Sequence, residues 1–138
     1  MSKSPKSYCS INLALEAFGD KWTLLIIRDM MLGEKRHFRE ILQSEEGIST
    51  NILTDRLAML EEKGIITKRQ DPSHKQKLIY RLTQKGIDLL PVIAAMAQWS
   101  LRHEAVSEES YRHTQALAEG GPALLRSFSQ DLETKHLL

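Results

Sequence analysis

The stretch GISTNILTDRLAMLEEKG, residues 47–64, predicts one helix over 49–63 with a marked start and a marked end. Ser49 is a favourable N-cap, because its hydroxyl can accept a hydrogen bond from an unpaired amide of the first turn. Gly64 can adopt the left-handed conformation that ends many helices. Between them, leucines recur at helical spacing and form one stripe that must be buried. These leucines are Leu53, Leu57 and Leu60.

The opposite face of this helix carries short hydrogen-bonding side chains in its first two turns, where a solvated helix usually carries Lys and Glu. Short polar side chains allow a helix to approach another surface closely. The base edges of the DNA major groove are one such surface, since Ser, Thr and Asn can bond the donors and acceptors there. The residues predicted to contact bases are Ser49, Thr50, Asn51 and Thr54. A polar face without a partner is the alternative interpretation.

The length of 138 residues predicts one domain with an appendage and a proper hydrophobic core. No apolar run approaches the roughly 20 residues that a membrane span needs. The polar start, MSKSPKSYCS, lacks the apolar segment of a secretory signal. A single cysteine, Cys9, excludes an internal disulfide framework and a Cys-based zinc cluster. Together these features predict a cytoplasmic protein without a membrane partner.

The net charge of +1 hides an uneven distribution along the chain. Residues 1–103 carry 16 Lys and Arg against 12 Asp and Glu, whereas residues 104–138 carry 3 against 6. A basic first part and an acidic tail are compatible with a nucleic-acid partner for the first part.

A second short helix is predicted at 38–43, and the turn SEEG separates it from the helix at 49–63. Two short helices joined by a short turn are typical of a helix-turn-helix. The segments 65–69 and 77–82 are rich in β-branched and aromatic residues, and the turn formers in QDPSHKQ lie between them. They predict a basic β-hairpin, the wing of a winged helix-turn-helix.

Basic residues surround the predicted recognition helix and continue into the wing, whose natural target is phosphate or the minor groove. A solvated hairpin whose lysines discourage edge aggregation is the alternative. The residues predicted to contact phosphate are Arg36, His37, Arg39, Arg56, Lys75 and Lys77.

Three further helices are predicted at 10–18, 21–32 and 83–103. The second is apolar on most sides and belongs in the core. The third is strongly apolar and starts at Thr83, and Pro91 should kink it or remove one hydrogen bond locally. Its apolar surface predicts contact with a second copy in a twofold dimer, with packing on its own domain as the alternative. The expected fold is mainly α with a small β-hairpin, a winged helix-turn-helix domain plus C-terminal dimerisation helices.

The expected domain boundaries are 1–103 for the winged helix with its dimerisation helices, and 104–138 for a helical C-terminal extension. Within the extension, one helix starts at Ser107 and another starts after Gly121, with Pro122 at its first position. The extension either enlarges the dimer contact or covers a pocket.

Four groups of residues, taken together, carry a family resemblance over about residues 9–103. They are Cys9; Gly19-Asp20-Lys21-Trp22 with Arg28-Asp29; Phe38-Arg39-Glu40-Ile41, Gly47-Ile48-Ser49, Leu53-Thr54-Asp55-Arg56-Leu57 and Leu60-Glu61; and Tyr80-Arg81-Leu82-Thr83 with Gly86. Their order and spacing resemble the HxlR-type family of bacterial winged-helix transcription regulators, relatives of the MarR group. The resemblance implies a homodimer on a pseudo-palindromic operator in double-stranded DNA. As a hypothesis, an unidentified small-molecule effector or Cys9 regulates binding by changing the spacing between the two recognition helices.

Some members of that family sense oxidants through an N-terminal cysteine, which makes Cys9 a candidate redox residue. A helix start, with Lys6 and Lys21 as neighbours, would lower the pKa of its thiol. An inert, buried cysteine is the alternative. The chain departs from the family in having Cys9-Ser10 where Cys-Pro is common, and in its longer tail.

The sequence contains no pattern typical of an enzyme. The five histidines are scattered, without HExxH or a metal-ligand spacing, and no glycine-rich phosphate loop is present. No cofactor or metal is therefore expected. The rival function is a winged-helix protein-interaction module without direct DNA binding, and the basic residues around the predicted recognition helix favour DNA.

Overall fold

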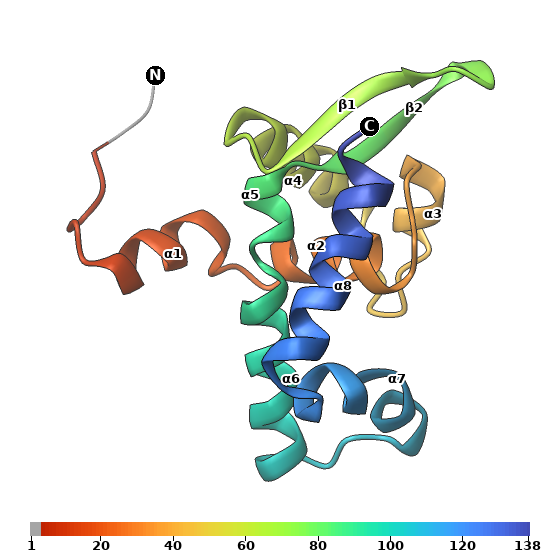
Figure 1. Ribbon diagram of the computed structural model, residues 1–138. Helices are drawn as coiled ribbons and strands as arrows, with labels where there is room; N and C mark the ends of the chain where they lie inside the picture. Colours follow the sequence, from red (N-terminus) through yellow and green to blue (C-terminus); the bar gives the residue numbers. More distant parts are fainter. Residues whose placement is uncertain (1–3) are drawn as a thin grey trace.

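The computed structural model describes residues 4–138, apart from the side chains of residues 75 and 76. The chain begins with the helices α1 (Ser10–Phe18), α2 (Thr23–Leu32), α3 (Phe38–Leu42) and α4 (Thr50–Glu62). A hairpin of β1 (Ile66–Asp71) and β2 (His74–Leu82) follows, and then α5 (Gln84–Ile87), α6 (Leu90–His103), α7 (Glu108–Glu119) and α8 (Gly121–His136). The predicted fold class, mainly α with a small β-hairpin, is confirmed (Figure 1).

The hydrophobic core is built around α2, as its nearly continuous apolar sequence predicts. Ile26, Ile27 and Met30 of this helix are at most 2% exposed. They cluster with Ile41 of α3 and with the leucine stripe of α4. Burying side chains of this size stabilises the folded state by roughly 1.5–3 kcal/mol each, so apolar packing holds α3 and α4 against α2.

The hairpin is longer than the sequence predicts. Its strands pair antiparallel from Ile66 opposite Leu82 to Asp71 opposite His74, with an irregularity after Gln70. They therefore extend toward the turn beyond the expected ranges of 65–69 and 77–82. The turn is correspondingly short, because Oδ1 of Asp71 accepts hydrogen bonds from the N–H of Ser73 at 2.9 Å and from its hydroxyl at 2.7 Å. The turn contains turn-forming residues of the predicted kind, but it spans fewer positions than the sequence predicts.

The helix predicted over 83–103 is two helices. Thr83 caps the first as expected, since its hydroxyl oxygen accepts the N–H of Gly86 at 3.3 Å. However, α5 ends at Ile87 and α6 begins at Leu90. Pro91 lies in the first turn of α6, where its missing N–H removes no intrahelical hydrogen bond. The expected single kinked helix is therefore wrong, because Pro91 starts a helix and does not interrupt one.

The tail forms the two helices that the sequence predicts. Ser107 caps α7 by accepting the N–H of Ser110 at 3.1 Å, and Pro122 lies in the first turn of α8. From α7, α8 runs back along α6 and ends beside the hairpin (Figure 1). Leu117 of α7 and Leu132 of α8 are buried in the same core as α2. The tail is therefore packed on the winged helix.

The helix α1 stands apart from the other elements (Figure 1). None of its residues is buried, and the apolar side chains of Ile11 and Leu15 expose 70% and 59% of their surface. Tyr8, just before the helix, is 79% exposed. Contiguous apolar surface of this kind is uncommon on a monomer and marks an interaction site.

Candidate nucleic-acid interface

The helix predicted at 49–63 is α4, and both of its ends are as expected. The hydroxyl oxygen of Ser49 accepts a hydrogen bond from the N–H of Ile52 at 3.2 Å, which confirms Ser49 as the N-cap. Gly64 has a φ of +74°, which a residue with a side chain adopts only with strain. The leucine stripe is at most 4% exposed, so one face of α4 is fixed against the core.

The opposite face of α4 points to solvent. Ser49, Thr50, Asn51 and Thr54 are all exposed, and these four residues are called here the reading face. Their side chains are short, so hydrogen-bond donors and acceptors lie close to the helix backbone. The oxygen of Ser49 is used by the cap, but its O–H can still donate. Such a surface can bond the base edges of a major groove.

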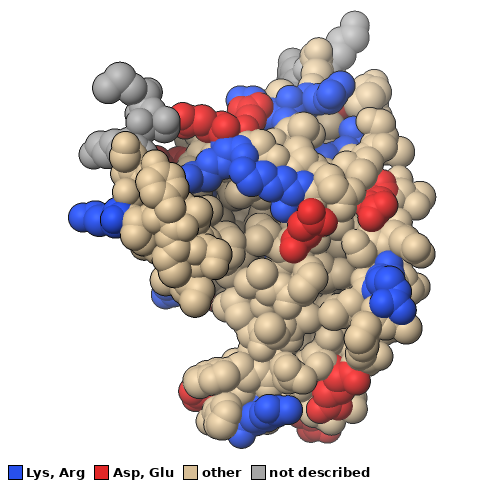
Figure 2. Space-filling model, turned by 60° about the vertical axis from the view of Figure 1, so that its left-hand side comes forward, with Lys and Arg blue, Asp and Glu red and all other residues tan. Residues whose placement is uncertain are grey.

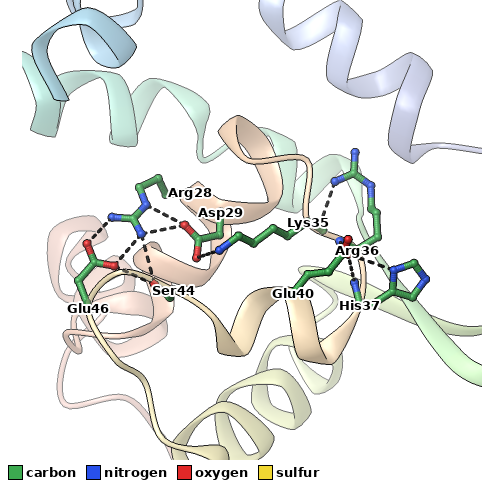
Figure 3. A network of polar contacts seen from close by, with 8 residues as sticks. All are labelled: Arg28, Asp29, Lys35, Arg36, His37, Glu40, Ser44 and Glu46. Atoms are coloured by element: carbon green, nitrogen blue, oxygen red, sulfur yellow. Dashed lines mark hydrogen bonds and ion pairs between the residues drawn. The ribbon is translucent and has the colours of Figure 1, made fainter. Parts of the chain in front are cut away.

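A network of polar contacts fastens the turn before α4 to α2 (Figure 3). Arg28 donates from Nη1 to Oε2 of Glu46 at 2.8 Å and from Nη2 to Oε1 at 2.7 Å. Its Nε donates to Asp29 at 3.0 Å, and Nζ of Lys35 lies 3.3 Å from the same carboxylate. Chiefly through Arg28, the pKa of Glu46 is lowered to about 2. A two-point arginine–carboxylate contact is directional, so it helps to position the chain that enters α4.

Asp20 joins the start of α2 to α4. Its carboxylate caps α2 by accepting the N–H groups of Trp22 at 3.0 Å and Thr23 at 3.1 Å. Oδ2 also accepts a hydrogen bond from Nε of Arg56 at 2.9 Å, while Arg56 pairs with Asp55 as well. Burial raises the pKa of Asp20, but the bonds from Thr23 and Arg56 outweigh it and hold this pKa at about 2. Arg56 is a predicted phosphate contact, and its bond to Asp20 also connects α4 with the start of α2.

Two surface hollows lie between α3 and the hairpin, and the first of them also reaches α4. One, of about 130 Å³, is lined by Thr54 of the reading face and by Phe38 of α3. The other, of about 380 Å³, is lined by Phe38, Arg39 and Lys77. Two predicted phosphate contacts, Arg39 and Lys77, therefore come together between α3 and β2, and both are exposed. Lys75 belongs to β2, but its side chain lies outside the described residues.

Two other predicted phosphate contacts, Arg36 and His37, are engaged within the protein. Nη1 of Arg36 donates to the carbonyl of Met30 at 2.9 Å, and burial lowers the pKa of Arg36. Nδ1 of His37 lies 3.0 Å from Glu40 (Figure 3). Nε2 of the same ring lies 2.8 Å from Asp71. These contacts connect the segment before α3 with α2 and with the tip of the hairpin.

Cys9 is the N-cap residue of α1 and is exposed. The backbone N–H groups of Asn12 and Ile11, at the start of α1, lower the pKa of its thiol. The effect comes from the backbone of the helix start, whereas the sequence suggests Lys6 and Lys21 as additional causes. The alternative of a buried cysteine is wrong, because the residue lies on the surface.

Within residues 4–138, no group of three or more His, Cys, Asp or Glu side chains could hold a metal ion. In the same part of the chain, no helix combines the length and the apolar character needed to cross a membrane.

Sequence reasoning missed three carboxylates that position the candidate interface: Asp20, Glu46 and Asp71. Asp20 carried a usable signal, since it directly precedes the helix predicted at 21–32 and Asp is a favoured N-cap residue. Glu46 and Asp71 carried none, because their partners Arg28 and His37 lie 18 and 34 positions away in the chain.

The comparisons with known proteins agree with this geometry. The sequence model of the family described as HxlR-like helix-turn-helix matches residues 17–108. An uncharacterised HTH-type transcriptional regulator of Mycobacterium tuberculosis is 38% identical over 90 residues, which are 65% of this chain and 56% of that protein. This chain therefore spans little more than half the length of that relative.

Two solved structures extend the comparison to three dimensions. PA1607, a candidate transcription factor, superposes with a TM-score of 0.67 at 32% identity, covering 75% of this chain and 70% of that chain. The redox regulator HypR in its oxidised form superposes with a TM-score of 0.60 at 29% identity, covering 71% of this chain and 100% of that chain. On the family match, which spans most of its length, this chain belongs to the HxlR-like helix-turn-helix family.

Proposed function

We propose that this chain is a sequence-specific DNA-binding transcription regulator. The observation that carries the proposal is the arrangement of α4, whose leucine stripe is buried and whose reading face is exposed. Arg39 and Lys77 are exposed in the adjoining hollow between α3 and β2, which shares Phe38 with the hollow that Thr54 lines. Membership of the HxlR-like helix-turn-helix family supports it, as does the relative named as an HTH-type transcriptional regulator.

In the proposed complex, α4 lies in the major groove and the reading face bonds base edges. Arg39 and Lys77, with Lys75, contact phosphates and set the depth and angle of the helix. Arg36, His37 and Arg56 act mainly by holding α3, the hairpin and α4 in place, and Arg56 is free to add a phosphate contact through its remaining N–H groups.

We further propose that the regulator is a homodimer on a pseudo-palindromic operator. On α1, Ile11 and Leu15 are exposed, and on α6, Met96 and Trp99 expose 52% and 56% of their surface although Ile93 of the same helix is buried. Figure 2 shows a face whose middle part is largely free of charged residues. Joining two such faces about a twofold axis would bury this apolar surface, with the reading faces about 34 Å apart, one turn of DNA.

The test is selection of binding sites from a random DNA pool with the purified protein. Enrichment of a pseudo-palindrome supports a dimeric, sequence-specific regulator. Failure to enrich any sequence, with the protein folded and dimeric in sedimentation, contradicts the proposal and favours the rival protein-interaction module.

Cys9 is a candidate redox residue within this function. It is exposed, its thiol pKa is lowered by the amides of α1, and α1 belongs to the proposed dimer contact. As the single cysteine, it could form a disulfide only with a second molecule. Site selection repeated with mild oxidant tests this role, and a Cys9→Ser variant with the oxidant response of the wild type would exclude it.

A further inference from the structure

A cavity of about 250 Å³ lies between α2, α6 and α7. Leu24, Leu25 and Arg28 of α2 form one wall, and Ala97 and Ser100 of α6 form the second. The third wall is the tail, which contributes Ser110, Thr114 and Leu117 of α7. This third wall lies beyond residue 108, where the match to the family ends, so the cavity depends on a part of the chain that the family model does not contain.

The lining is aliphatic with a few hydroxyl groups. Leu, Ile, Met, Ala and Val side chains supply most of it, and the hydroxyls of Ser100, Ser110 and Thr114 supply the polar part. The hydroxyl of Thr114 donates to the carbonyl of Ser110 at 2.9 Å, so its oxygen remains an acceptor. A ligand with one hydroxyl or carbonyl group can be bonded there while its apolar part packs on the leucines.

The charge of Arg28 does not favour an anionic ligand. Its guanidinium is already paired with Glu46 at 2.7 Å and with Asp29 at 2.8 Å. A carboxylate in the cavity would meet these two carboxylates and lose its hydration without gaining an unpaired cation. The chemistry of the walls therefore selects a neutral molecule.

We propose that this cavity binds a neutral, mainly aliphatic molecule of about ten non-hydrogen atoms that carries one hydroxyl or carbonyl group. The size follows from the volume, since a cavity of about 150 Å³ is sufficient for benzene. The cavity is partly open, and its lining includes Met96, which also belongs to the proposed dimer contact, so a contact between copies is the competing occupant that the test must distinguish.

A molecule bound in the cavity can affect the position of α4 through Arg28. This residue lines the cavity with part of its side chain and holds Glu46, in the turn before α4, with its guanidinium (Figure 3). A ligand that moves Arg28 moves the start of the reading face. This effect on DNA rests on the proposed function, whereas binding to the cavity does not.

Calorimetric titration of the full chain with 1-octanol tests the binding. We expect saturable binding of one molecule per chain. Ala97→Phe, which fills the cavity from α6, should weaken it at least about tenfold, whereas Ala95→Phe, on the exposed side of α6, should leave it unchanged. Ser110→Leu fills the cavity from the exposed wall of α7 and replaces Ala97→Phe if that variant does not fold. No saturable binding, or equal binding by the filled variants, overturns the proposal.

Two comparisons sharpen this test. Octanoate, which has the same chain length and a charge, should bind at least about tenfold more weakly than 1-octanol, and equal or tighter binding contradicts the neutral class. Sedimentation with and without 1-octanol should show the same oligomeric state. If 1-octanol and Ala97→Phe both convert the protein to monomers, the cavity is a contact between copies and the proposal is wrong.

The connection with DNA is tested on the selected operator. Saturating 1-octanol should change operator affinity by about fivefold or more. Glu46→Gln breaks the ion pair with Arg28 outside the cavity, so it should bind 1-octanol normally and lose most of this response. An operator affinity that does not respond to bound 1-octanol overturns the connection. A protein that binds 1-octanol but selects no operator contradicts the proposed function alone.

Discussion

Nδ1 of His136 accepts a hydrogen bond from the backbone N–H of Leu82 at 2.9 Å, although the two residues are 54 positions apart. His136 is only 3% exposed, and its Nε2 has no hydrogen-bond partner among the described residues. Since Nδ1 is the acceptor, the ring is neutral and carries its proton on Nε2. This bond fastens the end of α8 to the last residue of β2, next to the ion pair of Lys135 with Glu34 at 2.7 Å.

The fold should lose stability as the pH falls from about 6.5 to about 4. Burial and the positive charges of Arg36, Arg81 and Lys135 lower the pKa of His136 from 6.5 to about 4. Within this window the unfolded chain takes up a proton that the folded chain does not, so the free energy of unfolding decreases. At pH 5 the loss is about 2 kcal/mol, measured by urea unfolding against a sample at neutral pH.

His136→Gln is the matched control for this pH dependence, because Gln keeps an acceptor for the N–H of Leu82 but does not titrate. Between neutral pH and about pH 5, the wild type should lose about 2 kcal/mol more than the variant. The same loss in both proteins would show that His136 titrates normally in the folded state.

Asp20→Ala should lower the free energy of unfolding by about 1–2 kcal/mol, because it removes the cap of α2. It also removes the bond that holds Arg56 of α4. Asp55→Ala is the matched control, since Asp55 pairs with Arg56 but caps no helix, and its effect should stay within about 0.5 kcal/mol. Thermal or urea unfolding at neutral pH measures both, and equal effects would contradict the capping role.

Asn51→Ala should weaken operator binding by about 10- to 100-fold and leave binding to random DNA nearly unchanged, because it removes base contacts only. Glu62→Ala, at the exposed end of the same helix, should change neither. Gel-shift titrations on operator and random duplexes give both affinities. An equal loss on the two duplexes would exclude a base-reading role for Asn51.

Lys77→Ala should weaken binding to operator and random DNA alike, and should reduce the slope of log K against log salt by about one, because one phosphate contact is lost. The same result is expected for Lys75→Ala. Arg112→Ala removes an exposed charge on α7, away from the hairpin, and should leave the slope unchanged. An unchanged slope for Lys77→Ala would place Lys77 outside the interface.

Local signals in the sequence were sufficient to predict most of the secondary structure, and to predict which side of α4 is buried and which is exposed. Ser49 and Gly64 define the ends of α4, and the spacing of its leucines defines the buried side. The helix boundary at Pro91 was missed because the same residue can kink a helix or start one. Which of the two occurs depends on whether the preceding residues continue a helix into the proline, and in this protein α5 ends at Ile87, before Pro91.

The polar contacts that hold the candidate interface in place could not be predicted from local signals in the sequence. Arg28 has several carboxylates within reach along the chain, and only the folded structure pairs it with Glu46. Arg36 and His37 were predicted as phosphate contacts because they are basic, yet their nitrogens are bonded to Met30 and Asp71. A charge in a sequence does not reveal whether it faces solvent or a partner.

The sequence by itself determined most of the segments that become helices and strands, and that α4 buries leucines and exposes Asn51 and Thr54. These properties depend on residues within one or two helical turns of each other. Only the tertiary structure decided that α8 returns to the hairpin at His136 and that α7 closes a cavity against α2 and α6. Both depend on packing between segments far apart in the chain, where many pairings of apolar surfaces satisfy the same sequence pattern and only their fit in three dimensions selects one.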